Sequence, residues 1–315
     1  MKQELAKFFD VPPEGYSSIE LMLTEEEITL IEYMQDKKYT YEELLVLIQP
    51  RFDLDPKEFI SQAYKRGVIN KERRNDSIVY KSASLYTRLA YFAQYESDLW
   101  KSIAPKERED LDRWYVKKYA EGAIPRLKEI ENGSTNLIEN AFFYTLDETL
   151  NLIDELKEEM YIVPCNCKSV ALNCDKPKNV CILFEKDINS EWDRGWGEPI
   201  SKEKAKEIVT MANKKGLMHT SESEKAICNC DGCCCYPIRA SKMIGTQGIW
   251  PKKRYNILWE QDRCISCGIC AKVCNFNAFN KEGAMISFEK EKCWGCTICK
   301  EHCPVSAITL IKLDK

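Results

Sequence analysis

The chain has 315 residues, of which 44% are hydrophobic and 30% charged, so we expect an ordinary soluble composition divided into two or three domains. Its net charge of −4 argues against a protein that coats nucleic acid. The sequence has no apolar run near the roughly 20 residues that cross a bilayer and no signal-peptide core, which predicts a cytoplasmic protein without a membrane span.

The first part of the chain is predicted to be mostly helical. Helices there begin after residues that cap helix N-termini, often with acidic residues in the first turn. A glycine, Gly67, ends the last of them. The three predicted helices are residues 25–34 after Thr24, 41–48 after Thr40, and 57–66 after Asp55 and Pro56.

A β-hairpin is predicted next, with strands at 68–69 and 77–80 and a polar turn at 72–76. Three helices followed by a hairpin describe a winged helix-turn-helix. The third helix of such a module can enter the major groove while the wing contacts phosphates. The candidate nucleic-acid contacts are Lys65, Arg66, Arg73 and Arg74. Docking of another protein is the favoured interpretation, because base-reading side chains are few and the basic set is small.

A helical linker rich in tryptophan and tyrosine follows, and its aromatic residues are predicted to be core or interface. Residues 146–160 predict an amphipathic helix, and 161–163 predict a short strand that leads to Cys165. Ser201 caps a further predicted helix, which Gly216 ends.

All 17 cysteines lie at or after Cys165: nine within residues 161–256 and eight within 257–315. In a reducing cytosol such density indicates metal ligation rather than disulfides. The chain has only two histidines, His219 and His302, which argues against histidine-rich zinc chemistry. We interpret His219 as structural.

The central cysteines have irregular spacing. Soft thiolates suit iron–sulfur clusters or zinc, and we favour one or two [4Fe–4S] clusters over zinc. Adjacent side chains diverge, so we do not expect Cys233, Cys234 and Cys235 all to reach one cluster, and the ligand set stays open. The candidate metal ligands are Cys165, Cys167, Cys174, Cys181, Cys228, Cys230, Cys233, Cys234 and Cys235.

The C-terminal cysteines form two copies of Cys-x2-Cys-x2-Cys-x3-Cys, offset by 29 residues. Three cysteines with two residues between each pair can hold three corners of a cubane, and the fourth starts a helix that leads to the other cubane. Two complete copies argue against zinc. The expected ligand sets are Cys264, Cys267, Cys270 and Cys303 for one cluster, and Cys293, Cys296, Cys299 and Cys274 for the other.

These motifs resemble those of the bacterial two-cluster ferredoxins over roughly residues 257–313. The resemblance implies a pseudo-twofold fold of hairpins and helices, with Ala278 and Ala307 at equivalent places. Pro304 follows Cys303 as usual, but Asn275 follows Cys274. This departure leaves the loop conformation and the potential of the cluster that Cys274 serves in question.

The stretches PCNCKSVALNCDKPKNVC and ICNCDGCCC resemble uncharacterised dicluster proteins of anaerobic bacteria. That family joins a winged-helix-like region, a central cysteine-rich segment and a ferredoxin, and it implies anaerobic electron transfer. Asp231 stands where the family usually has a cysteine.

We therefore expect an α+β protein. Its predicted parts are a winged-helix-like domain at 1–90, a helical linker or docking region at 91–160, a cysteine-rich α/β domain at 161–256, and a 2[4Fe–4S] ferredoxin domain at 257–315.

The leading hypothesis is transfer of single electrons to a redox partner protein, because no nucleotide loop or nucleophile–base pair suggests an enzyme. The alternatives are a redox-responsive DNA-binding regulator and a reductase with an open central cluster. Association with further copies of the chain stays open.

Overall fold

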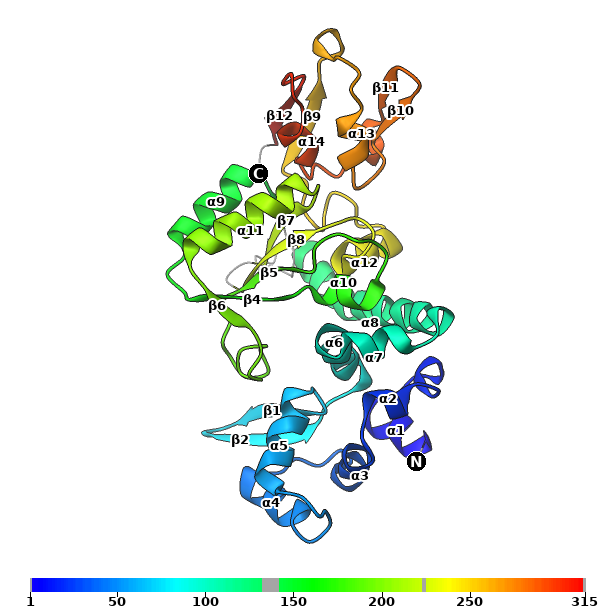
Figure 1. The fold of residues 1–315 in the computed structure, drawn as a ribbon, viewed down its shortest axis with the longest axis vertical. Helices are drawn as coiled ribbons and strands as arrows, with labels where there is room; N and C mark the ends of the chain where they lie inside the picture. The colour runs from blue at the N-terminus through cyan, green and yellow to red at the C-terminus, as the bar shows by residue number, and fades with distance from the viewer. Residues whose placement is uncertain (1, 132–141, 223–224, 314–315) are drawn as a thin grey trace. The chain divides into compact units, whose positions relative to one another are not determined.

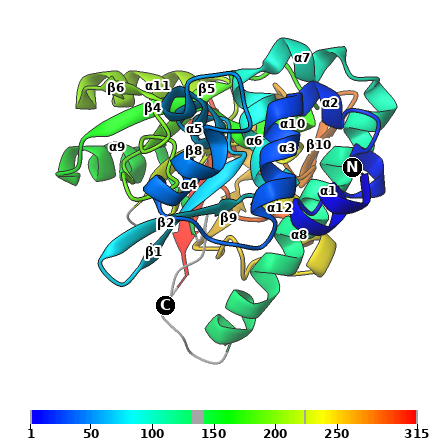
Figure 2. The ribbon, with the colours of Figure 1, turned by 90° about the horizontal axis from the view of Figure 1, so that it is seen from below.

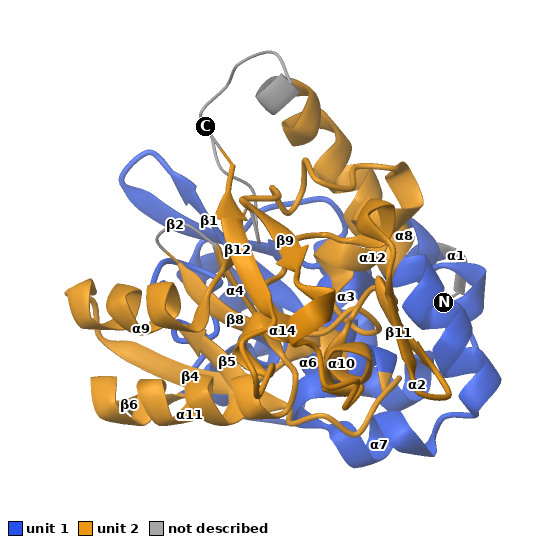
Figure 3. Ribbon diagram, turned by 90° about the horizontal axis from the view of Figure 1, so that it is seen from above, with its two compact units in different colours: residues 1–115, 169–171, 185–197 blue, residues 116–168, 172–184, 198–315 orange. Residues whose placement is uncertain are grey.

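The computed structural model describes residues 2–131, 142–222 and 225–313, and these form an α+β protein (Figure 1). The chain divides into two compact units (Figure 3). Unit 1 comprises residues 1–115, 169–171 and 185–197; unit 2 comprises 116–168, 172–184 and 198–315. The division into four domains stays a prediction.

Unit 1 begins with helices, and the three that the sequence predicts are confirmed. Thr24 and Thr40 each form a capping box with the glutamate three residues later, and the Asp55 side chain accepts two backbone N–H groups. These contacts satisfy N–H groups that the first helical turn leaves free. The helical elements here are α1 (Lys2–Phe8), η1 (Pro13–Gly15), α2 (Ile19–Met22), α3 (Glu25–Met34), α4 (Tyr41–Ile48) and α5 (Pro56–Lys65).

The predicted hairpin is present, but its strands are longer than expected. β1 (Ile69–Arg74) pairs with β2 (Ser77–Ser82), and only Asn75 and Asp76 lie between them. Asn75 has φ of 52°, which asparagine tolerates better than most residues. The polar residues that suggested a long turn therefore belong to β1. Figure 2 shows the hairpin beside α4 and α5. Three helices and a hairpin thus occur in the expected order, and their assignment as a winged helix stays a prediction.

The helical region that follows contains α6 (Leu85–Tyr95), α7 (Ser97–Ser102) and α8 (Pro105–Glu131), of which α8 runs from unit 1 into unit 2. Trp100 and Tyr115 are buried, as predicted for core aromatics. Residues 132–141 of the predicted linker lie outside the described part of the chain.

Unit 2 contains a six-stranded sheet in which every described pairing is antiparallel. The central region is therefore α+β, and the expected α/β arrangement is wrong. The strand order is β3 (Phe142–Tyr144), β7 (Met218–Glu222), β8 (Ala226–Cys230), β5 (Asn179–Leu183), β4 (Met160–Pro164) and β6 (Glu198–Ile200).

The helix predicted at residues 146–160 is shorter than expected. α9 (Leu146–Glu155) ends where Leu156 turns to extended backbone, and Met160 is the first residue of β4. Met160 matches the helical spacing of apolar residues, but the exposed residues 157–159 form the connection to the strand. The strand expected at 161–163 is confirmed within β4.

The two faces of this sheet carry different residues, because side chains alternate along a strand. α9 and the confirmed helix α11 (Lys202–Lys214) pack over one face, where Ile182 and Ile227 belong to the apolar core. Cys181, Cys228 and Cys230 alternate with these residues, so they point to the opposite face. The short helices α10 (Asn166–Ala171) and α12 (Tyr236–Ile244) begin next to further cysteines.

The C-terminal part of unit 2 repeats one pattern twice. β9 (Tyr255–Trp259) pairs with β12 (Ile308–Lys312), and β10 (Phe279–Glu282) pairs with β11 (Met285–Phe288). Between the strands lie η2 (Gln261–Arg263) and α13 (Ile269–Val273) in one repeat, and η3 (Lys290–Lys292) and α14 (Ile298–Glu301) in the other. Among the described residues, no helix is both long and apolar enough to cross a membrane.

Candidate metal centres

The eight C-terminal cysteines line two separate small hollows. One hollow is bordered by Cys264, Cys267, Cys270 and Cys303. The other is bordered by Cys274, Cys293, Cys296 and Cys299. Each therefore takes three cysteines from one motif and the fourth from the other, which is the crosswise grouping that the spacing predicts.

Backbone N–H groups point at sulfurs in equivalent places of the two repeats. The N–H of Ala278 donates to Cys274 Sγ and that of Ala307 donates to Cys303 Sγ, each at 3.2 Å. Burial raises the pKa of Cys296 and Cys299, so thiolates at these positions need a positively charged partner such as iron. The hollows and the N–H donors fit [4Fe–4S] clusters, in which cysteine thiolates ligate iron and N–H groups stabilise the negative sulfurs.

Six central cysteines form a closed ring of neighbouring thiols. The ring runs from Cys165 to Cys181 and Cys228, and returns through Cys230, Cys235 and Cys167; each side chain is in hydrogen-bond contact with the next. We call these residues the six-thiol ring. All six are either buried or half-buried.

Two kinds of element supply the ring. The sheet face opposite α11 contributes Cys181, Cys228 and Cys230, while Cys165 and Cys235 stand at the N-caps of α10 and α12. The N–H of Tyr236, in the first turn of α12, donates to Cys167 Sγ at 3.4 Å. A helix N-terminus favours negative charge, so it stabilises a thiolate in the ring.

Protons are shared unevenly within the ring. Hydrogen bonds from Cys167 and Cys181 hold the pKa of Cys165 well below its ordinary value, and Cys228 and Cys235 have the same effect on Cys230. The donor thiols are correspondingly harder to ionise. Six adjacent thiolates would repel one another strongly, so full deprotonation of the ring requires bound metal.

Lys168 places a positive charge beside the ring. Its side chain is 2% exposed, and its Nζ lies 3.7 Å from Cys165 Sγ and 2.8 Å from the Asn229 carbonyl oxygen. Burial alone would lower the pKa of Lys168, but the surrounding thiolates, Cys165 first, outweigh it and the net shift is upward. A buried ammonium ion is stable only with such partners.

The other three central cysteines, Cys174, Cys233 and Cys234, do not belong to the six-thiol ring and lie together with Asp231. Cys234 Sγ lies 3.7 Å from both Cys174 Sγ and Cys233 Sγ. Asp231 Oδ2 lies 3.7 Å from Cys174 Sγ, and its Oδ1 lies 3.3 Å from Cys233 Sγ. These four residues form a possible metal-binding group. The sequence did not identify Asp231 as a candidate ligand, although its place in the cysteine run was a signal.

The comparisons with known proteins identify one region of the chain. Residues 258–310 match the family model of the 4Fe-4S dicluster domain. The chain carries a C-terminal ferredoxin-like dicluster domain. No curated protein and no solved structure matches the chain, so the resemblance of the whole chain to anaerobic dicluster proteins stays a prediction.

The unusual Asn275 joins the dicluster domain to the central loops of unit 2. Its Oδ1 accepts the N–H of Gly232 at 3.1 Å, and its Nδ2 donates to the Gly216 carbonyl oxygen at 3.2 Å. A Cβ on Gly232 would collide with the Asn275 carbonyl oxygen. Proline has no side-chain amide and so would lack these hydrogen bonds, which gives a physical reason for asparagine at this position.

Both histidines make hydrogen bonds with the protein. The ring nitrogens of His219 contact the side chains of Asn213 and Asn229 at 3.1 and 2.7 Å. His302 Nε2 lies 2.8 Å from the Asn213 carbonyl oxygen. The contacts of His219 agree with its interpretation as structural.

The predicted nucleic-acid residues lie in unit 1, and three of them have partners there. Lys65 Nζ lies over the Trp196 ring, Arg66 pairs with Glu27 and Glu96, and Arg73 pairs with Asp187. Arg74 is exposed at the end of β1. These ion pairs neutralise part of the positive charge that a nucleic acid would bind, and the role of the four residues in nucleic-acid binding stays a prediction.

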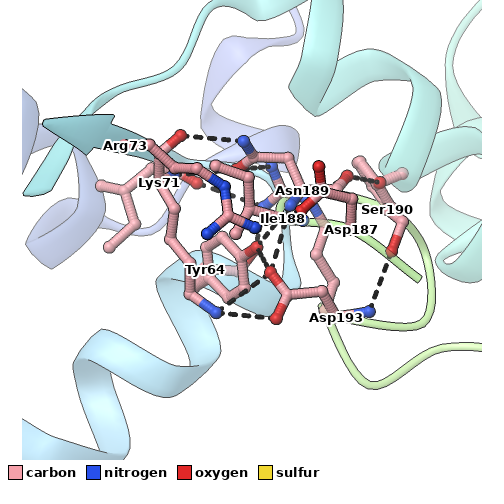
Figure 4. A network of polar contacts seen from close by, with 11 residues as sticks. Tyr64, Lys71, Arg73, Asp187, Ile188, Asn189, Ser190 and Asp193 are labelled. Atoms are coloured by element: carbon pink, nitrogen blue, oxygen red, sulfur yellow. Dashed lines mark hydrogen bonds and ion pairs between the residues drawn. The ribbon is translucent and has the colours of Figure 1, made fainter. Parts of the chain in front are cut away.

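Figure 4 shows how residues 187–193 hold the hairpin of unit 1. Lys71 Nζ pairs with Asp193 at 2.9 Å, and the Asn189 side chain bonds both backbone groups of Lys71. Tyr64 donates to Asp193. Burial acts to raise the pKa of Asp193, but the hydrogen bonds from Tyr64 and Lys71 produce a net lowering. A segment that the sequence analysis assigned to the cysteine-rich domain thus packs with the N-terminal elements.

Proposed function

We propose that this protein transfers single electrons between a redox partner protein and a central iron–sulfur centre held by the six-thiol ring. The match to a dicluster domain supports an iron–sulfur electron-transfer role. The observation that extends this role to the ring is an apolar core shared by ring and dicluster residues. We expect the protein to act in the reducing cytoplasm, where such thiols stay reduced.

The shared core places one C-terminal ligand close to the ring. Cys296 packs in the same apolar cluster as Cys230 and Cys235. Phe276 and Trp294 belong to that cluster, and their rings stack at 4.8 Å with planes 4° apart. An apolar, tightly packed connection excludes water, and so favours electron exchange without a large cost for solvent rearrangement around the changing charge.

Polar contacts fix the position of the dicluster domain against the central region of unit 2. Asn275 binds the loop at Gly232, and His302 binds the carbonyl oxygen of Asn213 in α11. Both residues directly adjoin cysteines of the dicluster domain, Cys274 and Cys303. These contacts support a fixed spacing between C-terminal and central centres, which efficient transfer requires.

The chemistry of the ring fits iron more closely than a hard cation, because all of its donors are soft thiolates. One cubane uses four cysteine ligands, so six thiols are enough for one cubane with two further thiols, or for a larger cluster. A bound cluster would supply reversible one-electron chemistry. Lys168 would offset part of its negative charge, and the N-terminus of α12 would stabilise Cys167.

Iron and sulfide content per chain, measured after anaerobic purification, tests this proposal. The C-terminal hollows account for about eight irons, and a cubane in the ring raises the total to about twelve. Replacing the ring ligand in a Cys181→Ala variant should return the count to about eight. A matched Cys233→Ala variant, outside the ring, should keep about twelve.

Electron paramagnetic resonance of the reduced protein then tests whether the centres communicate. Spin coupling between a C-terminal cluster and the ring centre should broaden the signal, and Cys181→Ala should remove that broadening. A wild-type protein with only about eight irons, or with uncoupled signals after full reduction, contradicts the proposal.

A further inference from the structure

We propose that Cys174, Asp231, Cys233 and Cys234 form a mononuclear zinc site, distinct from the iron–sulfur centres. This inference goes beyond the proposed electron transfer and does not depend on it. It concerns three cysteines that the six-thiol ring does not use.

The spacing of the donor atoms is that of ligands around one metal ion. Zinc is bound tetrahedrally with Zn–S bonds of about 2.3 Å, so two sulfurs on the same ion lie about 3.8 Å apart. Two Sγ–Sγ distances in this group are 3.7 Å. One oxygen of Asp231 and the three sulfurs all lie within 4.8 Å of one another.

The C-terminal sites provide an internal standard for a different metal group. Each cysteine there ligates a separate iron of a cubane, and the four cysteines border a hollow. The sulfurs of Cys174, Cys233 and Cys234 instead approach one another directly. With the carboxylate of Asp231 as the fourth donor, the group offers one set of four ligand atoms, which is the number that a single zinc ion binds.

Asp231 is held in place as a ligand before any metal binds. It is 1% exposed, and its Oδ1 accepts the N–H groups of Cys233 and Cys234 at 3.1 and 2.6 Å. Its Oδ2 faces Cys174 Sγ and Lys168 Nζ, each at 3.7 Å. Zinc accepts a carboxylate oxygen alongside thiolates, so Asp231 together with three cysteines is compatible with zinc.

The surrounding charge and exposure suit the entry and binding of a zinc ion. Three thiolates and one carboxylate exceed the charge of Zn²⁺, and the buried ammonium of Lys168 offsets part of the excess. Cys233 is exposed whereas Cys234 is buried. Zinc therefore has a route from solvent through the Cys233 side.

Bound zinc would fix the loop at residues 231–235, which contacts the dicluster domain and contributes Cys235 to the six-thiol ring. Gly232 lies between two ligands and contacts Asn275 of the dicluster domain, while Cys235 is the next residue after Cys234 and belongs to the ring. The ion would therefore position a ring ligand and the Asn275 contact without exchanging electrons itself.

Zinc and iron content of the full chain, purified anaerobically and treated with a metal-chelating resin, tests the inference. Wild type should keep about one zinc per chain, as four protein ligands form a closed site. Asp231→Ala and Cys174→Ala should lose that zinc, and both should keep the iron content of wild type. Asp175→Ala, which changes an exposed acid beside Cys174, should keep zinc and iron alike.

X-ray absorption at the zinc edge identifies the ligands. Wild type should show three sulfurs and one oxygen, and Asp231→Cys should show four sulfurs with the zinc retained. This conservative variant keeps the test decisive if Asp231→Ala does not fold. Zinc absent from wild type, or a loss of about four irons on Asp231→Ala, overturns the inference, since the latter indicates a cubane. The iron count of wild type reports separately on the six-thiol ring.

Discussion

The two cysteine-rich regions of unit 2 use different kinds of backbone to bring their thiols together. In the dicluster domain, cysteines with two or three residues between them, on tight loops and short helices, border two hollows. In the central region, strands and helix N-termini converge so that the thiols contact one another. A local loop keeps its ligands around a space of fixed size, whereas a sheet face brings together residues that are distant in the sequence.

The largest expected effect concerns the crosswise grouping of the C-terminal ligands. Cys274→Ala should remove about four irons, because Cys274 borders the hollow of Cys293, Cys296 and Cys299. Adding Cys296→Ala should remove no further cluster, whereas adding Cys267→Ala instead should remove a second one. Iron analysis of the two double variants measures this, and equal losses in both would contradict the crosswise arrangement.

Removing the buried charge of Lys168 should have the next largest effect, on the free energy of unfolding. This charge lies beside the central cysteines and not in the dicluster domain. Lys168→Met leaves Asp231 and the ring thiolates without their buried cation, which should lower the free energy of unfolding by about 3–5 kcal/mol. Anaerobic urea unfolding measures the change. Lys176→Met, at a less buried lysine near Asp231, is the matched control and should lose much less. Similar losses in the two variants would show that Lys168 has no special role.

Acid should weaken the central sheet through His219. Burial lowers the pKa of His219 to about 4, so between that value and the unfolded pKa of about 6.5 the unfolded chain binds the extra proton. Above about pH 6.5 His219 therefore costs the folded protein nothing. As the pH falls below that value, His219 lowers the free energy of unfolding by up to about 3 kcal/mol. His219→Gln should reduce this slope between pH 7 and 5 in urea titrations. An unchanged slope would mean that His219 has the same pKa in the folded and unfolded chains.

The smallest expected effect is at the junction between the two regions. Asn275→Ala removes the acceptor for the Gly232 N–H and the donor to the Gly216 carbonyl oxygen, at a cost of about 1–3 kcal/mol. Asn280→Ala removes a solvent-exposed hydrogen bond to Glu289 and should change stability by less than about 0.5 kcal/mol. The iron content should not change in either variant. A loss for Asn275→Ala no larger than for the control would remove the argument for a fixed junction.

This contrast explains what the sequence was able to predict. The C-terminal ligand groups follow from a repeated local spacing, and the capped helices at Thr24, Thr40 and Asp55 follow from residues next to one another in the chain. The six-thiol ring requires the register of β5 and β8 and the starting points of α10 and α12, none of which spacing reveals. Cys234 and Cys235 are neighbours in sequence, yet they contact different groups of thiols.

Prediction from the sequence was also incomplete where the partner of a residue lies far away along the chain. Arg73 was interpreted as part of a basic wing, but its partner Asp187 lies 114 residues away along the chain. Asn275 was noted as an atypical residue, and only its contacts with Gly216 and Gly232 give a reason for it. Long-range pairing of this kind depends on tertiary packing rather than on local propensity.

Anomalous diffraction from anaerobically grown crystals, recorded at the iron and zinc absorption edges, would locate each metal in unit 2. We expect iron in both C-terminal hollows and within the six-thiol ring, and one zinc ion between Cys174, Asp231, Cys233 and Cys234. Iron density at that last group, or a six-thiol ring without iron, would contradict this expectation.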